Sequence, residues 1–295
     1  MVSTKVAVTM TPEMRADAAM LAVCRRLAEI AEATLPGTLE DLDPEFLHDF
    51  RVAIRRTRSM LRELAGVLPA EVEDRARSDL RRVQAVTGPT RDLDVYLQDW
   101  DELVGGVALP ALHAELMRRR AEAFGAMSAD LRGEPFTSGW AHWRGVLDTP
   151  PADGGPRAGD PIGELAAQRV RKVYGRMVKL GGSIDEDSPA EDLHTLRKRG
   201  KELRYLLEIF GGLWPKDDVK PMVAALKGLQ DVLGSFQDRE VQADFLRGLD
   251  AADEGVGAVA ERLLGDQAAA RAEFAERFEA FASEANRSRV ARVFG

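Results

Sequence analysis

Apolar residues recur along this chain at the three- and four-residue spacing of amphipathic helices, and the alternation expected of strands is nearly absent. Good helix formers fill the periodic segments, and Gly or Pro residues separate them. The pattern predicts helices over residues 12–34, 45–67, 70–87, 91–104, 109–131, 161–180, 189–211, 216–233, 237–250 and 256–285. The breaks are predicted at Pro36-Gly37, Pro69, Gly88-Pro89, Gly105-Gly106, Gly181-Gly182, Gly211-Gly212, Gly234 and Gly255. We therefore expect an all-α fold.

The chain contains an internal repeat. Residues 148–161 form its richest Pro/Gly stretch and are predicted to be a linker near the midpoint. The segments on either side match without a gap at a constant offset, which places His48 on His194. LHDFRVAIRRTRSMLREL aligns with LHTLRKRGKELRYLLEIF, and LRRVQAVTGPTRDLDV aligns with LKGLQDVLGSFQDREV. We expect one domain over residues 1–295, with helical halves at 12–147 and 162–285 related by a pseudo-two-fold axis and enclosing a basic cleft.

One helix of each half carries basic residues on one side. At about 100° per residue, these residues lie within roughly a quarter of the helix circumference. The first stripe is His48, Arg51, Arg55 and Arg58, which Arg62 continues one turn further on, and the second stripe is His194, Arg197, Lys201 and Arg204. The opposite sides carry Phe50, Thr57, Leu61 and Leu64 in the first helix and Leu196, Leu203, Leu207 and Phe210 in the second. These apolar sides are predicted to pack in the core.

A charged helix side is ordinarily solvated, but three features favour an anion site here. Like charges at three- and four-residue spacing destabilise a helix. The stripe occurs in both halves. The protein as a whole is acidic, with 49 acidic against 41 basic residues and a net charge of −8. Mutual repulsion is tolerable if the stripes line a cleft for a polyanion. We expect the groove to be extended by Arg26, Arg62, Arg81, Lys172, Lys227 and Tyr205.

The histidines and nearby acids have simple expected roles. Neighbouring arginines should keep His48 and His194 from protonating, because like charges disfavour the charged form. No further metal-ligand pattern accompanies them, and Cys24 is the sole cysteine, so we expect no metal and no cofactor. Asp92 and Asp238 follow glycines predicted to end a helix. They are expected to cap the next helix, with pairing to an arginine of the stripe as the alternative.

Together these strings resemble the CHAD family, the conserved-histidine α-helical domain, over residues 12 to 285. The resemblance implies an all-helical fold of two pseudo-symmetric halves around a basic cleft, binding of inorganic polyphosphate and no catalytic activity of its own. By position, it implies His48, Arg51, Arg55, Arg58, His194, Arg197, Lys201 and Arg204 as the polyphosphate-binding residues. Arg62 has no basic counterpart, since Glu208 stands at the equivalent position.

Members of this family often follow a CYTH triphosphate-tunnel domain, whose signature is E-x-E-x-K/R on a strand. The only similar string here runs from Glu71 to Arg75, inside a predicted helix. We therefore expect a stand-alone member of the family.

The expected partner is inorganic polyphosphate, including polyphosphate granules. A scaffold that docks a phosphorylated or acidic protein accounts for the same pattern. Nucleic acid is less well supported, because Tyr205 is the only aromatic residue near either stripe. A metal-dependent phosphohydrolase is less well supported still, since no Walker-type loop is present and no catalytic residue is evident. With no secretory signal and no membrane-length apolar run, we expect a cytoplasmic protein that does not enter a membrane.

Overall fold

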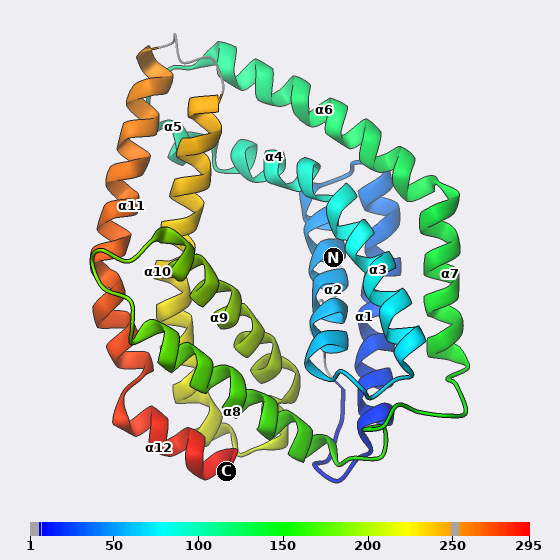
Figure 1. Cartoon of the computed structure of the whole chain (residues 1–295). Coiled ribbons are helices and arrows are strands. Elements are labelled where there is room, and N and C mark those ends of the chain that lie inside the picture. Colours follow the sequence, from blue (N-terminus) through cyan, green and yellow to red (C-terminus); the bar gives the residue numbers. More distant parts are fainter. Residues whose placement is uncertain (1–5, 7, 249–253) are drawn as a thin grey trace. The chain divides into compact units, whose positions relative to one another are not determined.

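The computed structural model describes residues 6, 8–248 and 254–295, and these residues are largely helical (Figure 1). The helices are α1 (Ala16–Leu39), α2 (Pro44–Glu63), α3 (Ala70–Val86), α4 (Gly88–Gln98), α5 (Trp100–Val104), α6 (Pro110–Arg132), α7 (Glu134–Asp148), α8 (Ile162–Gly181), α9 (Ala190–Phe210), η1 (Gly211–Leu213), α10 (Lys216–Gly248), α11 (Glu254–Phe281) and α12 (Glu284–Val293). Within the described part no strand occurs, and a single β-bridge pairs Arg15 with Pro161. The all-α prediction is confirmed.

The chain divides into two compact units. Unit 1 comprises Met1–Glu102 and Pro110–Leu165, and unit 2 comprises Leu103–Leu109 and Ala166–Gly295. Helices α8, α9 and α10 begin at residues 162, 190 and 216, each 146 residues after the starts of α1, α2 and α3 at 16, 44 and 70. The helix order of the first half therefore recurs in the second. The predicted pseudo-two-fold axis and shared cleft concern the placement of one unit on the other and stay predictions.

Residues 148–161, the predicted linker, belong to unit 1. The amide of Ala16 donates to the carbonyl of Asp160 (2.9 Å), and the amide of Gly155 donates to the carbonyl of Val67 (3.0 Å). A Cβ on Gly155 would lie 2.3 Å from the carbonyl oxygen of Gly66, so only glycine allows this approach. Backbone hydrogen bonds thus hold the Pro/Gly-rich stretch against the unit.

The break predicted at Pro36-Gly37 is wrong, because both residues lie inside α1. A Cβ on Gly37 would lie 2.4 Å from Cγ of Phe46, so glycine provides the room in which the Phe46 ring at the start of α2 packs on α1. This packing keeps the last turn of α1 helical despite the proline.

The break predicted at Gly234 is also wrong. Helix α10 runs unbroken through this residue and joins the two helices predicted at 216–233 and 237–250, of which residues 249 and 250 lie outside the described part. In the first half, α3 ends at Val86 and α4 restarts with Pro89 in its first turn. Ser235 stands where the first half has Pro89, and its backbone N–H can continue the helix. Glycine alone costs a helix about 1 kcal/mol and does not end it.

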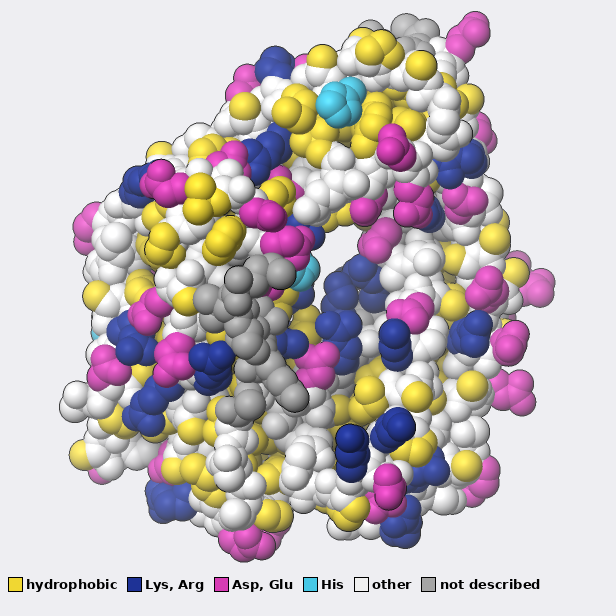
Figure 2. Space-filling model, turned by 180° about the vertical axis from the view of Figure 1, so that it is seen from behind, with side chains coloured by type: hydrophobic (Ala, Val, Ile, Leu, Met, Phe, Trp, Pro, Cys, Tyr) yellow, Lys and Arg dark blue, Asp and Glu magenta, His cyan; other side chains and the backbone are white. Residues whose placement is uncertain are grey.

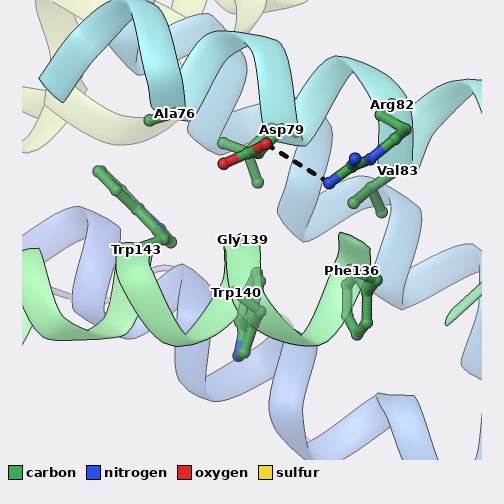
Figure 3. Close-up of a pocket in the computed structure, with 9 residues that line it drawn as sticks. Ala76, Asp79, Arg82, Val83, Phe136, Gly139, Trp140 and Trp143 are labelled. Atoms are coloured by element: carbon green, nitrogen blue, oxygen red, sulfur yellow. Dashed lines mark hydrogen bonds and ion pairs between the residues drawn. The ribbon is translucent and has the colours of Figure 1, made fainter. Parts of the chain in front are cut away.

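Helix α7 was not predicted, because its sequence is rich in Gly and aromatic residues and poor in strong helix formers. Burial stabilises it: Phe136 and Trp143 are 6% and 3% exposed. Figure 3 shows these side chains beneath α3, with Asp79 of α3 directed toward Gly139 of α7. A Cβ on Gly139 would lie 3.0 Å from Cγ of Asp79, so the glycine permits this close packing.

The helix predicted over 256–285 is divided in two. Helix α11 ends at Phe281, and Ser283 caps α12 by accepting a hydrogen bond from the amide of Asn286. No described helix is both long and apolar enough to span a membrane.

Candidate functional site

The first stripe lies on α2. Asp43 caps this helix by accepting the amide of Glu45 (2.8 Å), and Pro44 occupies its first turn. The predicted core side is confirmed, since Phe50, Thr57, Leu61 and Leu64 are all buried. The four residues of the first stripe are half-buried, and Arg62 one turn further on is exposed. Helix α2 thus presents a continuous basic edge at the boundary between core and solvent.

Arg51 ties α2 to α3. Its Nη1 donates to the backbone carbonyl of Gln84 (3.0 Å) and to Oγ1 of Thr87 (2.5 Å). The side-chain amide of Gln84 donates in return to the carbonyl of Arg51 (3.0 Å). All three partners are neutral, so the guanidinium is positioned without being neutralised by these contacts.

Positive charges gather around Arg51 and His48. Burial lowers the pKa of the Arg51 guanidinium, Arg55 and Arg91 act in the same direction, and Asp92 opposes them. Burial is also the main cause that lowers the pKa of His48, and the charges of Arg91 and Arg55 add to it. The expectation that His48 resists protonation is confirmed in direction, with burial contributing more than the charges.

The end of the first stripe meets a second helix. Arg58 interacts with Arg81 of α3 and with Arg62, and both positive charges add to burial in lowering the pKa of Arg58. Arg62 also forms an ion pair with Glu63, at 2.8 Å between Nε and Oε1. The structure therefore brings Arg81 and Arg62 to the first stripe.

The second stripe lies on α9, and its histidine contacts acids. Leu196, Leu203, Leu207 and Phe210 are buried as predicted. Nε2 of His194 lies 2.6 Å from Oε2 of Glu240 on α10, and Nδ1 lies 3.4 Å from Oε2 of Glu191. His194 is thus held between two carboxylates.

The arginines of the second stripe are also paired with acids. Arg197 donates through Nη2 to Oδ1 of Asp238 on α10 (2.9 Å), and Arg204 donates through Nε to Oε1 of Glu208 (2.9 Å). Lys201 is half-buried on the same side of α9.

The predicted capping role of the aspartates is wrong. Asp92 lies in the second turn of α4, and Asp238 lies deep inside α10, so neither precedes a helix. Asp238 instead pairs with Arg197, which is the alternative considered for it. The cap was expected because Gly234 was predicted to end a helix, and α10 does not end there.

The remaining candidates are Arg26, Lys172, Lys227 and Tyr205. Arg26 forms an ion pair with Glu29 on α1 (3.0 Å). Lys172 on α8 and Lys227 on α10 are exposed. Tyr205 is 6% exposed, and Cζ of Arg204 lies 5.8 Å from its ring centroid. The ring of Tyr205 is thus buried beneath an arginine and not presented for stacking on a base.

Two arginines were not predicted from the sequence. Arg91 on α4 acts on both His48 and Arg51, and its position after the Gly88-Pro89 break was the available signal. Arg120 on α6 donates to the buried carboxylate of Asp94 (2.9 Å) and pairs with Asp41. No sequence signal identifies Arg120, because its partners lie far away along the chain.

The two units use equivalent acids differently. Asp94 is the counterpart of Glu240 in the repeat, but Asp94 pairs with Arg120 whereas Glu240 contacts His194. Among the residues with described side chains, no group of three or more His, Cys, Asp or Glu is arranged to hold a metal ion. On the face shown in Figure 2, acidic side chains are widely spread, and several Lys and Arg side chains adjoin one another.

The family model of the CHAD domain matches residues 22–247, which is most of the chain. The chain belongs to the CHAD family. This CHAD chain is 27% identical over 216 residues to an uncharacterized protein of Mycobacterium tuberculosis, MT2285 in strain CDC 1551 and Rv2226 in strain H37Rv. The match covers 68% of this chain but only 39% of the relative's length.

Two solved structures share the CHAD fold. The CHAD domain from the plant Ricinus communis has a TM-score of 0.69 and 22% identity, and the alignment covers 97% of this chain and 96% of that one. PptA from Streptomyces chartreusis has a TM-score of 0.70 and 14% identity, over 90% of this chain and 100% of that one.

Proposed function

We propose that this CHAD domain binds inorganic polyphosphate through the first and second stripes and does not act on it chemically. The observation that carries the proposal is the cluster of half-buried cations formed by the first stripe on α2 and Arg91 on α4, in which Arg55 and Arg91 act against the charge of Arg51 and Asp92 acts in its favour. Such repulsion destabilises the free protein, and a bound polyanion would neutralise it. Family membership supports the proposal, since the CHAD family is associated with polyphosphate.

The chemistry of the side chains favours phosphate over nucleic acid. Guanidinium groups make forked, charge-assisted hydrogen bonds to phosphate oxygens. Single-stranded nucleic acid additionally uses aromatic faces for its bases. The one aromatic residue predicted near a stripe, Tyr205, is buried.

The absence of catalysis is part of the proposal. Three acids next to the stripes already contact basic side chains: Asp94 contacts Arg120, Asp238 contacts Arg197 and Glu240 contacts His194. We expect no phosphate release from tripolyphosphate, ATP or long-chain polyphosphate with Mg²⁺ or Mn²⁺. Turnover that Asp238→Ala abolishes would contradict this part.

Calorimetric titration at fixed ionic strength tests the ligand. Long-chain polyphosphate should bind more tightly than single-stranded RNA or duplex DNA of equal charge, and its affinity should fall steeply as salt rises. Equal or tighter binding of either nucleic acid contradicts the proposal. A phosphorylated peptide that binds more tightly than polyphosphate identifies a protein partner instead.

A pair of matched variants tests the stripe. Arg55→Ala with Arg58→Ala should weaken polyphosphate binding by about 100-fold, because each desolvated charged contact contributes roughly 1.5–3 kcal/mol. The control is Arg118→Ala with Arg119→Ala, which changes the charge equally at exposed positions on α6. Those two arginines already pair with Glu115. Equal weakening by both double variants would show that the first stripe is only a solvated helix side.

A further inference from the structure

Two arginines at the end of the first stripe have no acidic partner. Arg58 on α2 is half-buried and Arg81 on α3 is exposed. In the part of the chain that the structure describes, no hydrogen bond or ion pair joins either one to a carboxylate. The charges acting on Arg58 come from Arg81 and Arg62, and both are positive.

The packing of α2 on α3 places these two arginines opposite each other. One tie is the reciprocal pair of hydrogen bonds between Arg51 and Gln84. The other is a hydrogen bond from Arg77 of α3 to the carbonyl of Leu61 of α2. The residue numbers rise along one helix as they fall along the other, so α2 and α3 run antiparallel. Arg58 and Arg81 lie between these two sets of hydrogen bonds, which hold the two neighbouring helices together.

The equivalent positions in unit 2 are Arg204 and Lys227. Arg204 is engaged by Glu208 at 2.9 Å, and Glu208 stands where unit 1 has Arg62. Two further members of the second stripe also meet acids, Arg197 at Asp238 and His194 at Glu240. A phosphate that binds there must first displace carboxylates, whereas Arg58 and Arg81 are available at once.

Resting on the proposed function, we infer that the two stripes are unequal. Arg58 and Arg81 together form the first phosphate site, and the carboxylates of unit 2 mask the second stripe. The two guanidinium groups, one from each helix, donate to the non-bridging oxygens of the same or adjacent phosphoryl groups. The bound charge then removes the repulsion between the two arginines. The second stripe contributes only after its acids have been displaced.

Variants at equivalent positions test the inequality. We compare Arg58→Ala with Arg81→Ala against Arg204→Ala with Lys227→Ala, which remove the same charge from unit 1 and from unit 2. The ligands are tripolyphosphate and long-chain polyphosphate. The unit 1 variant should lose affinity by about 100-fold, and the unit 2 variant by less than about fivefold, since Arg204 is already paired with Glu208 and Lys227 is an exposed single charge. The variant Arg58→Gln with Arg81→Gln keeps the aliphatic stems in place and should show the same loss.

Neutralising the carboxylates that pair with the second stripe tests the second half of the inference. Asp238→Asn with Glu240→Gln should raise polyphosphate affinity by about fivefold or more, because Arg197 and His194 are released. The control is Glu115→Gln with Glu122→Gln on α6, which changes the net charge equally away from the stripes and should raise affinity less. An unchanged affinity, or an equal rise in the control, contradicts masking.

The outcomes separate the two proposals. A wild-type chain that binds neither phosphate ligand contradicts the proposed function, and the inference falls with it. A wild-type chain that binds, with unit 1 and unit 2 variants equally weakened, contradicts only the inference. Circular dichroism and thermal melting of each variant establish that it is folded before its affinity is compared.

Discussion

Arg25 and Arg171 make the same kind of hydrogen bond in the two units. Nε of Arg25, on α1, donates to the carbonyl of Leu147 near the end of α7 (2.7 Å). Nη1 of Arg171, on α8, donates to the carbonyl of Phe294 just after α12 (2.5 Å). These arginines stand at equivalent positions of the repeat. Each unit therefore fastens its last helix to its first helix in the same way.

Loss of either hydrogen bond should lower the stability of the unit that contains it. Arg25→Ala and Arg171→Ala should each lower the free energy of unfolding by about 1–3 kcal/mol, because the freed carbonyl loses a charged donor. Urea unfolding measures the change. Arg176→Ala, at an exposed position further along α8, is the control, and a loss as large there would show that the effect is not specific to this bond.

Arg51 should matter for stability as well as for binding. Arg51→Ala removes two hydrogen bonds from α2 to α3 and should cost about 1–3 kcal/mol of unfolding free energy. Arg58→Ala should cost less, since it removes no ion pair to an acid and relieves repulsion from Arg81. A melting curve for each variant checks that Arg51→Ala is the more destabilising of the two. The opposite order would show that the hydrogen bonds from Arg51 to Gln84 and Thr87 do not form.

Arg120 should be the most sensitive arginine of α6. Its partner Asp94 is 2% exposed, so Arg120→Ala leaves a buried carboxylate without its cation, at a cost of about 3–5 kcal/mol. The neighbouring Arg119→Ala removes only an exposed pair with Glu115 and should cost less than about 1 kcal/mol. Chemical denaturation of both variants measures the difference, and similar losses would rule out the buried network.

His48 should make binding depend on pH. Its pKa is lowered, so as pH falls below the ordinary histidine pKa the unfolded chain gains a proton that the folded chain resists, and folding stability decreases. A bound polyanion stabilises the imidazolium, so affinity should rise as pH falls through the same range. NMR titration of the imidazole with and without tripolyphosphate should show the pKa moving upward on binding.

The variant His48→Gln should remove that part of the pH dependence, and His142→Gln on α7 should leave it in place. A His48 pKa that does not move when tripolyphosphate binds would place the ligand elsewhere.

The helices and the basic stripes were predictable because they depend on periodicity. The buried side of α2 follows directly from the spacing of Phe50, Leu61 and Leu64. The ends of helices were less predictable, since they depend on neighbours. Pro36 stays helical because α2 packs on that turn, and α7 is stabilised by aromatic burial that its local sequence does not reveal.

The partners of the charged residues were the least predictable part of the site. The two stripes look alike in sequence, yet Arg197 meets Asp238 across two helices, whereas Arg58 meets Arg81. Such pairings depend on which helix faces which, and spacing within a single helix carries no information about them.

Ser235, which stands in α10 where unit 1 has Pro89, also affects the stiffness of the helix; the proline that α10 does contain, Pro221, lies near its start. At about 1.5 Å per residue, 33 unbroken residues make a stiff rod of about 50 Å. In the matching stretch of unit 1, the helix is interrupted at Thr87, between α3 and α4. Nη1 of Arg51 donates a hydrogen bond to the Thr87 hydroxyl at this interruption. A ligand that binds the Arg51 guanidinium would break this hydrogen bond and loosen the connection between α3 and α4. Amide hydrogen exchange around Gly88 should therefore become faster when polyphosphate binds, while exchange around Gly234 stays slow. The two copies of the repeat thus differ in this stretch, which is two helices in unit 1 and one continuous helix in unit 2.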